Sequence, residues 1–254
     1  MKKLMTLALA LTIAGAAFAQ EYKIAKSTGR LEINEVNNVT IEGYSGNEII
    51  FSSLDNRGDK DPRSQGLRAI SSNGLEDNTG IGLAVRENGS TYEVYQLKKM
   101  DGPRVKIQVP KGVSIYYRHT SPHGSDVKVR NFEGEIDINT VHNSIRIDNV
   151  TGPIKAGTAH GEVEVNFNDN IKGPVYLNST HGLVDVSLPA ATKANVMLSN
   201  SHGEIFVDPN LKLEVPKSGE WTKYGSSKVD GKINGGGIEI TLTSSHGNIY
   251  LRKK

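Results

Sequence analysis

The chain has 254 residues, among them 30 lysines and arginines, 28 aspartates and glutamates, seven histidines and no cysteine. A charge balance this even lacks the basic excess that nucleic-acid-binding proteins carry, and the absence of cysteine excludes disulfide bonds. We therefore expect no nucleic-acid partner, and a fold held together by packing and backbone hydrogen bonds alone.

The first segment, residues 1–19, is expected to be a secretory signal peptide. It combines the basic Lys2 and Lys3, the apolar run LMTLALALTIAGAA and the small-x-small sequence Ala17-Phe18-Ala19, which are the three parts of an export signal. No later apolar run reaches the eighteen or more residues that a membrane span needs. We expect an exported protein without an integral membrane segment, located in the periplasm, at the cell surface or outside the cell.

Short runs of alternating apolar and polar residues follow the leader. They are bounded by Gly, Asn and Pro and lie at residues 30–36, 38–44, 104–110, 135–139 and 237–242. This period of two predicts half-buried strands, and no comparable helical pattern occurs. Residues 52–66 are polar and rich in turn formers, so they are expected to form an exposed loop.

One phrase centred on histidine recurs five times in the second half of the chain. Its histidines are His142, His160, His181, His202 and His246, spaced by 18, 21, 21 and 44 residues, and His123 precedes them by 19. Repeats near twenty residues predict a solenoid, whose units bury their apolar edges only against neighbouring units. The last spacing is about two periods, and it predicts an insertion at residues 208–237.

The position of each residue relative to the histidine predicts its direction. Apolar residues four before and three and five after the histidine are expected to face inward, stacked coil on coil at about 4.8 Å. Two residues before the histidine, a small polar residue is expected to line each corner: Thr140, Thr158, Ser179, Asn200 and Ser244. Four residues after it, one outward column is expected to contain Arg146, Glu164, Asp185, Phe206 and Tyr250, with Lys128 in the same column one coil earlier.

These patterns predict an all-β fold, a single β-solenoid domain over residues 20–254 with coils of about 18–22 residues. Residues 20–118 are expected to form less regular strands and loops, and residues 119–254 the regular His-Gly coils. Glycine follows four of the five histidines, with Asn143 after His142, and it is expected to provide either a positive φ or a close approach between backbones.

The chain also resembles a bacterial family, the exported "putative adhesin" proteins, whose β-strand repeats have no assigned function. The resemblance rests on the leader and on IEGYSGNEIIF (41–51), LEDNTGIGL (75–83), VKIQVPKGVSI (105–115) and INGGGIEITLTSSHGNIYL (233–251). It implies a single-stranded, right-handed parallel β-helix with a less regular amino-terminal part. It supplies no catalytic or cofactor-binding residues.

The histidine column is the sharpest candidate site. His142, His160, His181 and His202 are expected to stack as a structural ladder, with weak metal binding as the alternative. A straight ladder offers an ion at most two adjacent rings, whereas a structural zinc site needs four converging ligands. Catalysis by the column is the least favoured reading, because no nucleophile with a partnered base accompanies it.

Two further groups of residues are candidates for binding. Trp221, Tyr176, Phe206 and Tyr250 are expected either to form a strip that stacks on a ligand or to pack under the insertion. In DNRGDKD (55–61), acidic residues resemble an incomplete calcium loop, and Arg57-Gly58-Asp59 matches an integrin-type tripeptide. The spacing departs from the EF-hand pattern, so a solvated turn is the favoured interpretation.

The favoured function is an exported, non-enzymatic β-solenoid with a binding or structural role in the cell envelope, needing no cofactor, with an envelope protein or glycan as partner. One alternative is a carbohydrate-active β-helix enzyme, which requires carboxylates clustered in one groove. The acidic residues are expected to lie dispersed over coils and faces: Asp126, Asp137, Asp148, Glu164, Asp185 and Glu204. A third possibility is a periplasmic protein that binds metal through its histidine column.

Overall fold

The computed structural model describes residues 21–55, 62–67, 70–71, 74–215 and 227–254. The predicted leader and Trp221 lie outside these residues. The described part contains twenty β-strands and two short 3₁₀ turns, η2 (Pro62–Ser64) and η3 (Pro209–Leu211), and no α-helix. None of its helical segments is long and apolar enough to cross a membrane.

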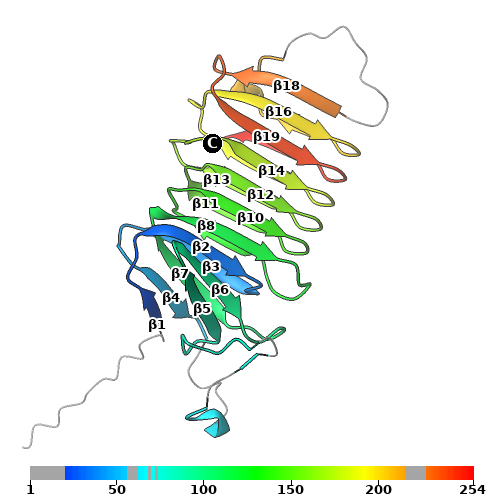
Figure 1. Cartoon of the computed structure of the whole chain (residues 1–254). Coiled ribbons are helices and arrows are strands. Elements are labelled where there is room, and N and C mark those ends of the chain that lie inside the picture. Colours follow the sequence, from blue (N-terminus) through cyan, green and yellow to red (C-terminus); the bar gives the residue numbers. More distant parts are fainter. Residues whose placement is uncertain (1–20, 56–61, 68–69, 72–73, 216–226) are drawn as a thin grey trace, which may run out of the picture.

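The strands form two sheets of ten strands each, stacked as an elongated pile of coils (Figure 1). Sheet A contains, in spatial order, β1 (Glu21–Ile24), β4 (Ile49–Ser53), β7 (Arg104–Pro110), β3 (Asn38–Tyr44), β9 (Val127–Arg130), β11 (Ile145–Val150), β13 (Val163–Phe167), β15 (Val184–Leu188), β20 (Ile249–Lys253) and β17 (Ile205–Val207). Sheet B contains β18 (Ser227–Ile233), β16 (Ala194–Asn200), β19 (Ile238–Ser244), β14 (Val175–Ser179), β12 (Ile154–Thr158), β10 (Ile136–Thr140), β8 (Gly112–His119), β2 (Thr28–Asn34), β6 (Thr91–Gln96) and β5 (Leu83–Asn88).

Each coil consists of one strand of sheet B followed by one strand of sheet A, as in β10 and β11. Equivalent strands of neighbouring coils pair in parallel, and Ile136, Ile154 and Val175 are successive register partners. Their sequence separations, 18 and 21 residues, equal the spacing of the histidines. The predicted all-β parallel solenoid is therefore confirmed.

A single hydrophobic core runs between the two sheets, because alternate residues of every coil strand face inward. The predicted column Ile138, Ala156, Leu177, Leu242 and Leu198 is at most 2% exposed. The corner residues from Thr140 to Ser244 are buried as well. Only Ile205 and Val207 of the inward set remain half-exposed, because β17 is the last strand of sheet A.

The last two coils do not stack in sequence order, and here the register prediction needs a correction. β19 pairs with β14 on one side and β16 on the other, and β20 lies between β15 and β17. The carboxy-terminal coil thus occupies the layer between the two coils that precede it in sequence. Part of the predicted insertion forms β18, which pairs antiparallel with β16 and covers the end of sheet B.

The amino-terminal end shows the same intercalation, here with the first coil of the chain placed between two coils that follow it in sequence. The first coil, β2 and β3, lies between the coil of β6 and β7 and the coil of β8 and β9. Antiparallel strands close this end: β5 pairs with β6, β4 pairs with β7, and β1 pairs with β4. These antiparallel strands account for the less regular character of the described residues between 21 and 118.

Candidate functional site

The histidines of the repeat stack on the outside of one corner of the solenoid. Ring centroids are 5.3 Å apart for His142 and His160, 4.9 Å for His160 and His181, 4.7 Å for His181 and His246, and 4.8 Å for His246 and His202. Neighbouring rings are inclined by 5° to 22°, and all five side chains are exposed. We call these five residues the histidine ladder. His246 stands between His181 and His202 because its coil is intercalated there.

Hydrogen bonds between coils fix this corner. Ser179 Oγ accepts from the backbone N–H of Gly182 at 2.8 Å and donates to the carbonyl of Gly161 in the preceding coil at 2.8 Å. Ser244 makes the same two bonds at 3.0 Å, to Gly247 N–H and the Gly182 carbonyl. The small polar residue therefore satisfies buried backbone groups at each turn, which explains its place two residues before the histidine.

The glycine after the histidine is required by close backbone approach. A Cβ added to Gly182 would overlap the carbonyl oxygen of Gly161, and one added to Gly247 would overlap that of Gly182. None of the corner glycines 161, 182, 203 and 247 has a positive φ. The structure therefore supports close backbone approach, and not a positive φ, as the reason for glycine at these positions. The Ser-x-His-Gly phrase is thus accounted for as a corner, apart from the imidazole itself.

The corner of β8 departs from the rest, and the sequence reasoning missed it. His119 is fully buried and aligns with Thr140, while His123 does not stack on His142. Asn37 donates its amide N–H groups to Lys99 and Met100 carbonyls, so its Oδ1 accepts from His119 Nε2–H at 3.0 Å. Burial lowers the pKa of His119, which is held as the neutral ring.

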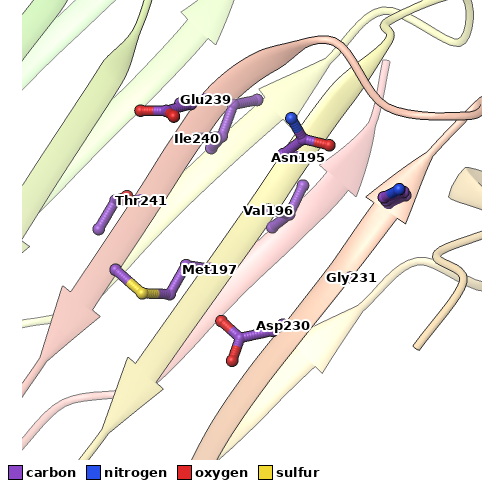
Figure 2. A pocket seen from close by; sticks show the side chains of 9 residues that line it. Asn195, Val196, Met197, Asp230, Gly231, Glu239, Ile240 and Thr241 are labelled. Atoms are coloured by element: carbon purple, nitrogen blue, oxygen red, sulfur yellow. The ribbon is translucent and has the colours of Figure 1, made fainter. Parts of the chain in front are cut away.

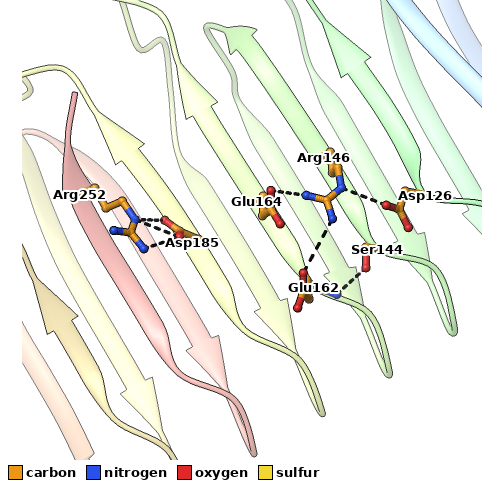
Figure 3. Close-up of polar contacts among 7 residues, drawn as sticks. All are labelled: Asp126, Ser144, Arg146, Glu162, Glu164, Asp185 and Arg252. Carbon is orange, nitrogen blue, oxygen red and sulfur yellow. Dashed lines mark hydrogen bonds and ion pairs between the residues drawn. The ribbon is translucent and has the colours of Figure 1, made fainter.

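Register pairing places the predicted outward column on the outer face of sheet A. Figure 3 shows three of its members, Arg146, Glu164 and Asp185. Arg146 contacts Asp126 at 3.0 Å, Glu164 at 2.5 Å and Glu162 at 3.9 Å. These carboxylates raise the pKa of Arg146, above all through the hydrogen bond that Arg146 Nε–H donates to Asp126. The expectation that the acidic residues are dispersed is therefore wrong for Asp126 and Glu164, and also for Asp148 and Asp185, which lie with Glu164 on this face. Asp126 and Glu164 converge because β9, β11 and β13 are neighbours, and the guanidinium fills the space between them.

Two of the four predicted stacking residues meet on this same face. Phe206 and Tyr250 are stacked with centroids 5.2 Å apart, and the Arg252 guanidinium lies 5.0 Å from the centre of the Tyr250 ring. Arg252 in turn binds Asp185 with two nitrogens at 2.8 Å, and the pKa of Arg252 is raised by that bond. Phe206, at the end of the column, is 44% exposed.

Tyr176 belongs to the opposite face and cannot join that strip. It lies on β14 of sheet B, where its hydroxyl donates to Glu239 Oε2 at 3.1 Å, a bond that raises the pKa of Tyr176. Beside it, β19, β16 and β18 form an open hollow of about 440 Å³ around Met197 (Figure 2). Glu239, Asn195 and Asp230 stand at its margins.

A second hollow, of about 350 Å³, lies on sheet A between the Arg146 cluster and the Arg252–Asp185 pair. Its polar lining is Arg146, Asp148, Glu164, Asn166, Asp185, Ser187 and Arg252. Asn166 donates to Asp148 at 2.8 Å, but its own Oδ1 has no hydrogen-bond partner within the described part of the chain. Tyr250 is the register partner of Asp185, so the aromatic pair begins where this hollow ends.

The incomplete calcium loop is only partly visible. Asp55 is bound by Arg104, with the Arg104 Nε 2.8 Å from Asp55 Oδ1, and the pKa of Asp55 is lowered. Residues 56–61, which include the Arg57-Gly58-Asp59 tripeptide, lie outside the described residues. Within the described ranges, no group of three or more His, Asp or Glu side chains is placed to hold a metal ion.

Comparison with known proteins gives the family of the chain. The model of the Toastrack DUF4097 family matches residues 119–252, slightly more than half of the chain. No curated protein matches it. A "putative cell adhesion protein" from Clostridium sporogenes is 14% identical, with 93% of this chain and 100% of that chain covered and a TM-score of 0.49. A "putative adhesin" from Bacteroides fragilis is 12% identical, with 94% and 98% covered and a TM-score of 0.36.

The family match confirms the predicted resemblance to an adhesin-like β-repeat family without an assigned function. It spans the regular coils, from His119 at the end of β8 to Arg252 in β20. The chain belongs to the Toastrack DUF4097 family.

Proposed function

We propose that the chain is an exported, non-enzymatic binding protein that holds a glycan of the cell envelope on the outer face of sheet A. The observation that carries this proposal is the stack of exposed Phe206 on half-buried Tyr250, directly beside a polar hollow. Glycan-binding surfaces need this combination, because a sugar ring presents an apolar C–H face together with a rim of hydroxyl groups. Aromatic rings pack against the C–H face, and paired polar side chains form hydrogen bonds with the hydroxyl groups.

The rigidity of the surface supports binding. Tyr250 and Asp185 lie on adjacent, hydrogen-bonded strands, and Arg252 is held between the Tyr250 ring and the Asp185 carboxylate. Side chains fixed in this way lose little conformational entropy when a ligand binds. Asn166 lines the hollow, and its buried Oδ1 is an acceptor without a donor among the described residues. A ligand hydroxyl or a water bound there would supply the missing bond.

The same face holds the strongest argument for the enzyme alternative, because Asp126, Glu162 and Glu164 gather around Arg146. A glycosidase needs the space between its two carboxyl groups for the scissile bond and, in inverting enzymes, for water. Here that space contains the Arg146 guanidinium. The geometry therefore favours binding over hydrolysis, and an assay that detected glycan cleavage lost in Glu164→Gln would reverse this choice.

The proposal is tested on a glycan array and by pull-down from the native envelope, both with the full chain. We expect retained glycans, and a loss of about tenfold or more in affinity for Phe206→Ala, since a central aromatic contact is worth about 1–2 kcal/mol or more. Tyr176→Ala is the matched control: Tyr176 is 42% exposed, close to the 44% of Phe206, but lies on the opposite sheet.

Equal loss of binding in Phe206→Ala and Tyr176→Ala would show that sheet A is not the binding face. Retention of envelope proteins by the chain, with no glycan bound on the array, would replace the glycan by a protein partner. Either result would overturn the proposal as stated.

A further inference from the structure

The histidine ladder has a property that its corner role does not require. The hydroxyl-to-glycine bonds and the backbone pairing hold the corner through Ser179, Ser244 and their equivalents. The rings of His246 and His202 add a bond only to carbonyls that already accept from the backbone N–H of the same histidine. The five rings nevertheless stand in one continuous row, each 4.7–5.3 Å from the next and exposed to solvent. Such a row presents ring nitrogens, which are common ligands of metal ions.

The ring nitrogens at the carboxy-terminal end of the ladder are already oriented. Nδ1 of His246 lies 3.2 Å from the Thr180 carbonyl, and Nδ1 of His202 lies 3.2 Å from the Ser245 carbonyl. A carbonyl only accepts, so Nδ1 carries the proton, and the lone pair of the neutral ring is on Nε2. Histidines that bind metals in proteins are held by this same Nδ1–H bond to a carbonyl, with Nε2 free for the ion.

The spacing sets how many rings one ion can contact. A metal–nitrogen bond is about 2.0–2.1 Å, so two nitrogens of adjacent rings can reach one ion only after the rings tilt towards each other. His181 and His246 are the closest pair, at 4.7 Å, and are already inclined by 22°. A third ring of the row is a further coil away, in agreement with the absence of any three-ligand group among the described residues.

We propose that adjacent imidazoles of the histidine ladder bind transition-metal ions in pairs, with water completing the coordination. Imidazole nitrogen is a ligand for Zn²⁺, Ni²⁺ and Cu²⁺, whereas Ca²⁺ and Mg²⁺ require oxygen. Five rings in a row form at most two separate pairs, so the ladder takes up to two ions. Such sites are open and exchange their metal, unlike a closed structural zinc site.

The spatial order of the rings provides a sharp test. His160→Asn with His246→Asn leaves His142, His181 and His202, none of which then has a stacked neighbour. The matched variant, His123→Asn with His142→Asn, removes the same number of histidines but leaves four rings stacked in a row. If the coils were stacked in sequence order, the first variant would instead keep His181 beside His202.

Calorimetric titration of the full chain, without an affinity tag, with zinc chloride and nickel chloride compares these proteins. We expect the first variant to bind about tenfold or more weakly than the parent, because the second ligand of each pair acts at high effective concentration. The matched variant should bind like the parent. Equal affinity in the parent and the first variant, or equal loss in both variants, would overturn the proposal.

A second measurement needs no variant, and it decides the question if the first variant does not fold. Zinc added to the isotopically labelled parent should shift the Nε2 resonances of the ladder before those of His123, which stacks on no other histidine in the described structure. Simultaneous shifts of His123 and the ladder would show independent single imidazoles and would contradict paired binding.

Discussion

The two ends of the solenoid share one design and differ in one detail. At each end, the terminal coil of the chain lies one layer inside the stack, and the coil next to it in sequence lies outside it. At the amino-terminal end, antiparallel strands cover both sheets: β4 and β1 on sheet A, and β5 on sheet B. At the carboxy-terminal end, β18 covers sheet B, whereas the described part of sheet A stops at β17.

This difference shows how a repeat protein can close itself. An open solenoid end is a row of unpaired backbone groups, and antiparallel strands block further parallel coils. The intercalated coil at each end pairs with a coil on both of its sides. In a solenoid stacked in sequence order, the first and last coils would each have a neighbour on one side only. The exposed edge at β17 is short, with three residues, and Phe206 beside it is the outermost ring of the aromatic pair.

Removal of the intercalated coil should have the largest effect. Deletion of residues 238–254 removes Ile240, Leu242, Ile249 and Leu251, each at most 1% exposed. Burial of four such side chains contributes on the order of 10 kcal/mol, which is comparable to the whole stability of a domain. We expect loss of cooperative unfolding, measured by circular dichroism during heating.

A shorter deletion, of an outer strand at the other end, provides the control. Removal of residues 21–27 takes away β1, an outer strand whose Tyr22 and Ile24 are only partly buried. This variant should keep a cooperative transition at a lower midpoint. If the two deletions destabilised the protein equally, intercalation would have no special role at the carboxy-terminal end.

The regular corners depend on close backbone contact, which a single methyl group disturbs. In Gly182→Ala the new Cβ would overlap the Gly161 carbonyl, so two coils must separate, at an expected cost of about 2–4 kcal/mol in the free energy of unfolding. Gly157→Ala is the control, because the nearest atom is 3.7 Å from its Cβ. Chemical denaturation measures both, and equal losses would contradict the account of the corner.

At the amino-terminal corners, Asn37 and His119 replace the hydroxyl-to-glycine bonds. Burial lowers the pKa of His119, so the unfolded chain binds a proton at higher pH than the folded one. Stability from the neutral ring is complete above about pH 6.5 and is lost as the pH falls below it, by about 1.4 kcal/mol for each unit of pKa difference. We expect the free energy of unfolding of His119→Gln to decrease less than that of the parent between pH 7 and pH 5. Parallel curves for the parent and the variant would remove His119 from the acid response.

Periodicity was sufficient to predict which residues face inward. A period of two within strands and of about twenty between coils fixes the register, so the columns from Ile138 to Leu242 and the polar corners follow from counting. His119 was missed because the loop of its corner is longer. Eight positions separate His119 from Val127, whereas five separate Thr140 from Ile145, so counting back from His142 leads to His123.

The order of the last two coils could not be predicted from the pattern. Leu198 and Leu242 occupy the same position of the repeat, and nothing in the repeat favours one over the other as the partner of Leu177. In the structure Leu242 pairs with Leu177, and Leu198 pairs with Leu242. The order of the two coils depends on β18. This strand pairs antiparallel with one edge of β16, so β16 has one edge left for a parallel partner, and that partner is β19. The cluster around Arg146 was missed for a related reason, since spacing places charges on a face without showing how far long side chains reach.

Engineered disulfides test the intercalated order most directly, because the chain has no native cysteine. Asn178 and Thr243 are register partners on adjacent strands, about 4.8 Å apart, within the reach of a disulfide. Ser199 is the partner of Thr243 on the far side, and thus two strands from Asn178. We predict rapid oxidation of Asn178→Cys/Thr243→Cys and none of Asn178→Cys/Ser199→Cys. The reverse result would show that the coils stack in sequence order and would contradict the fold described here.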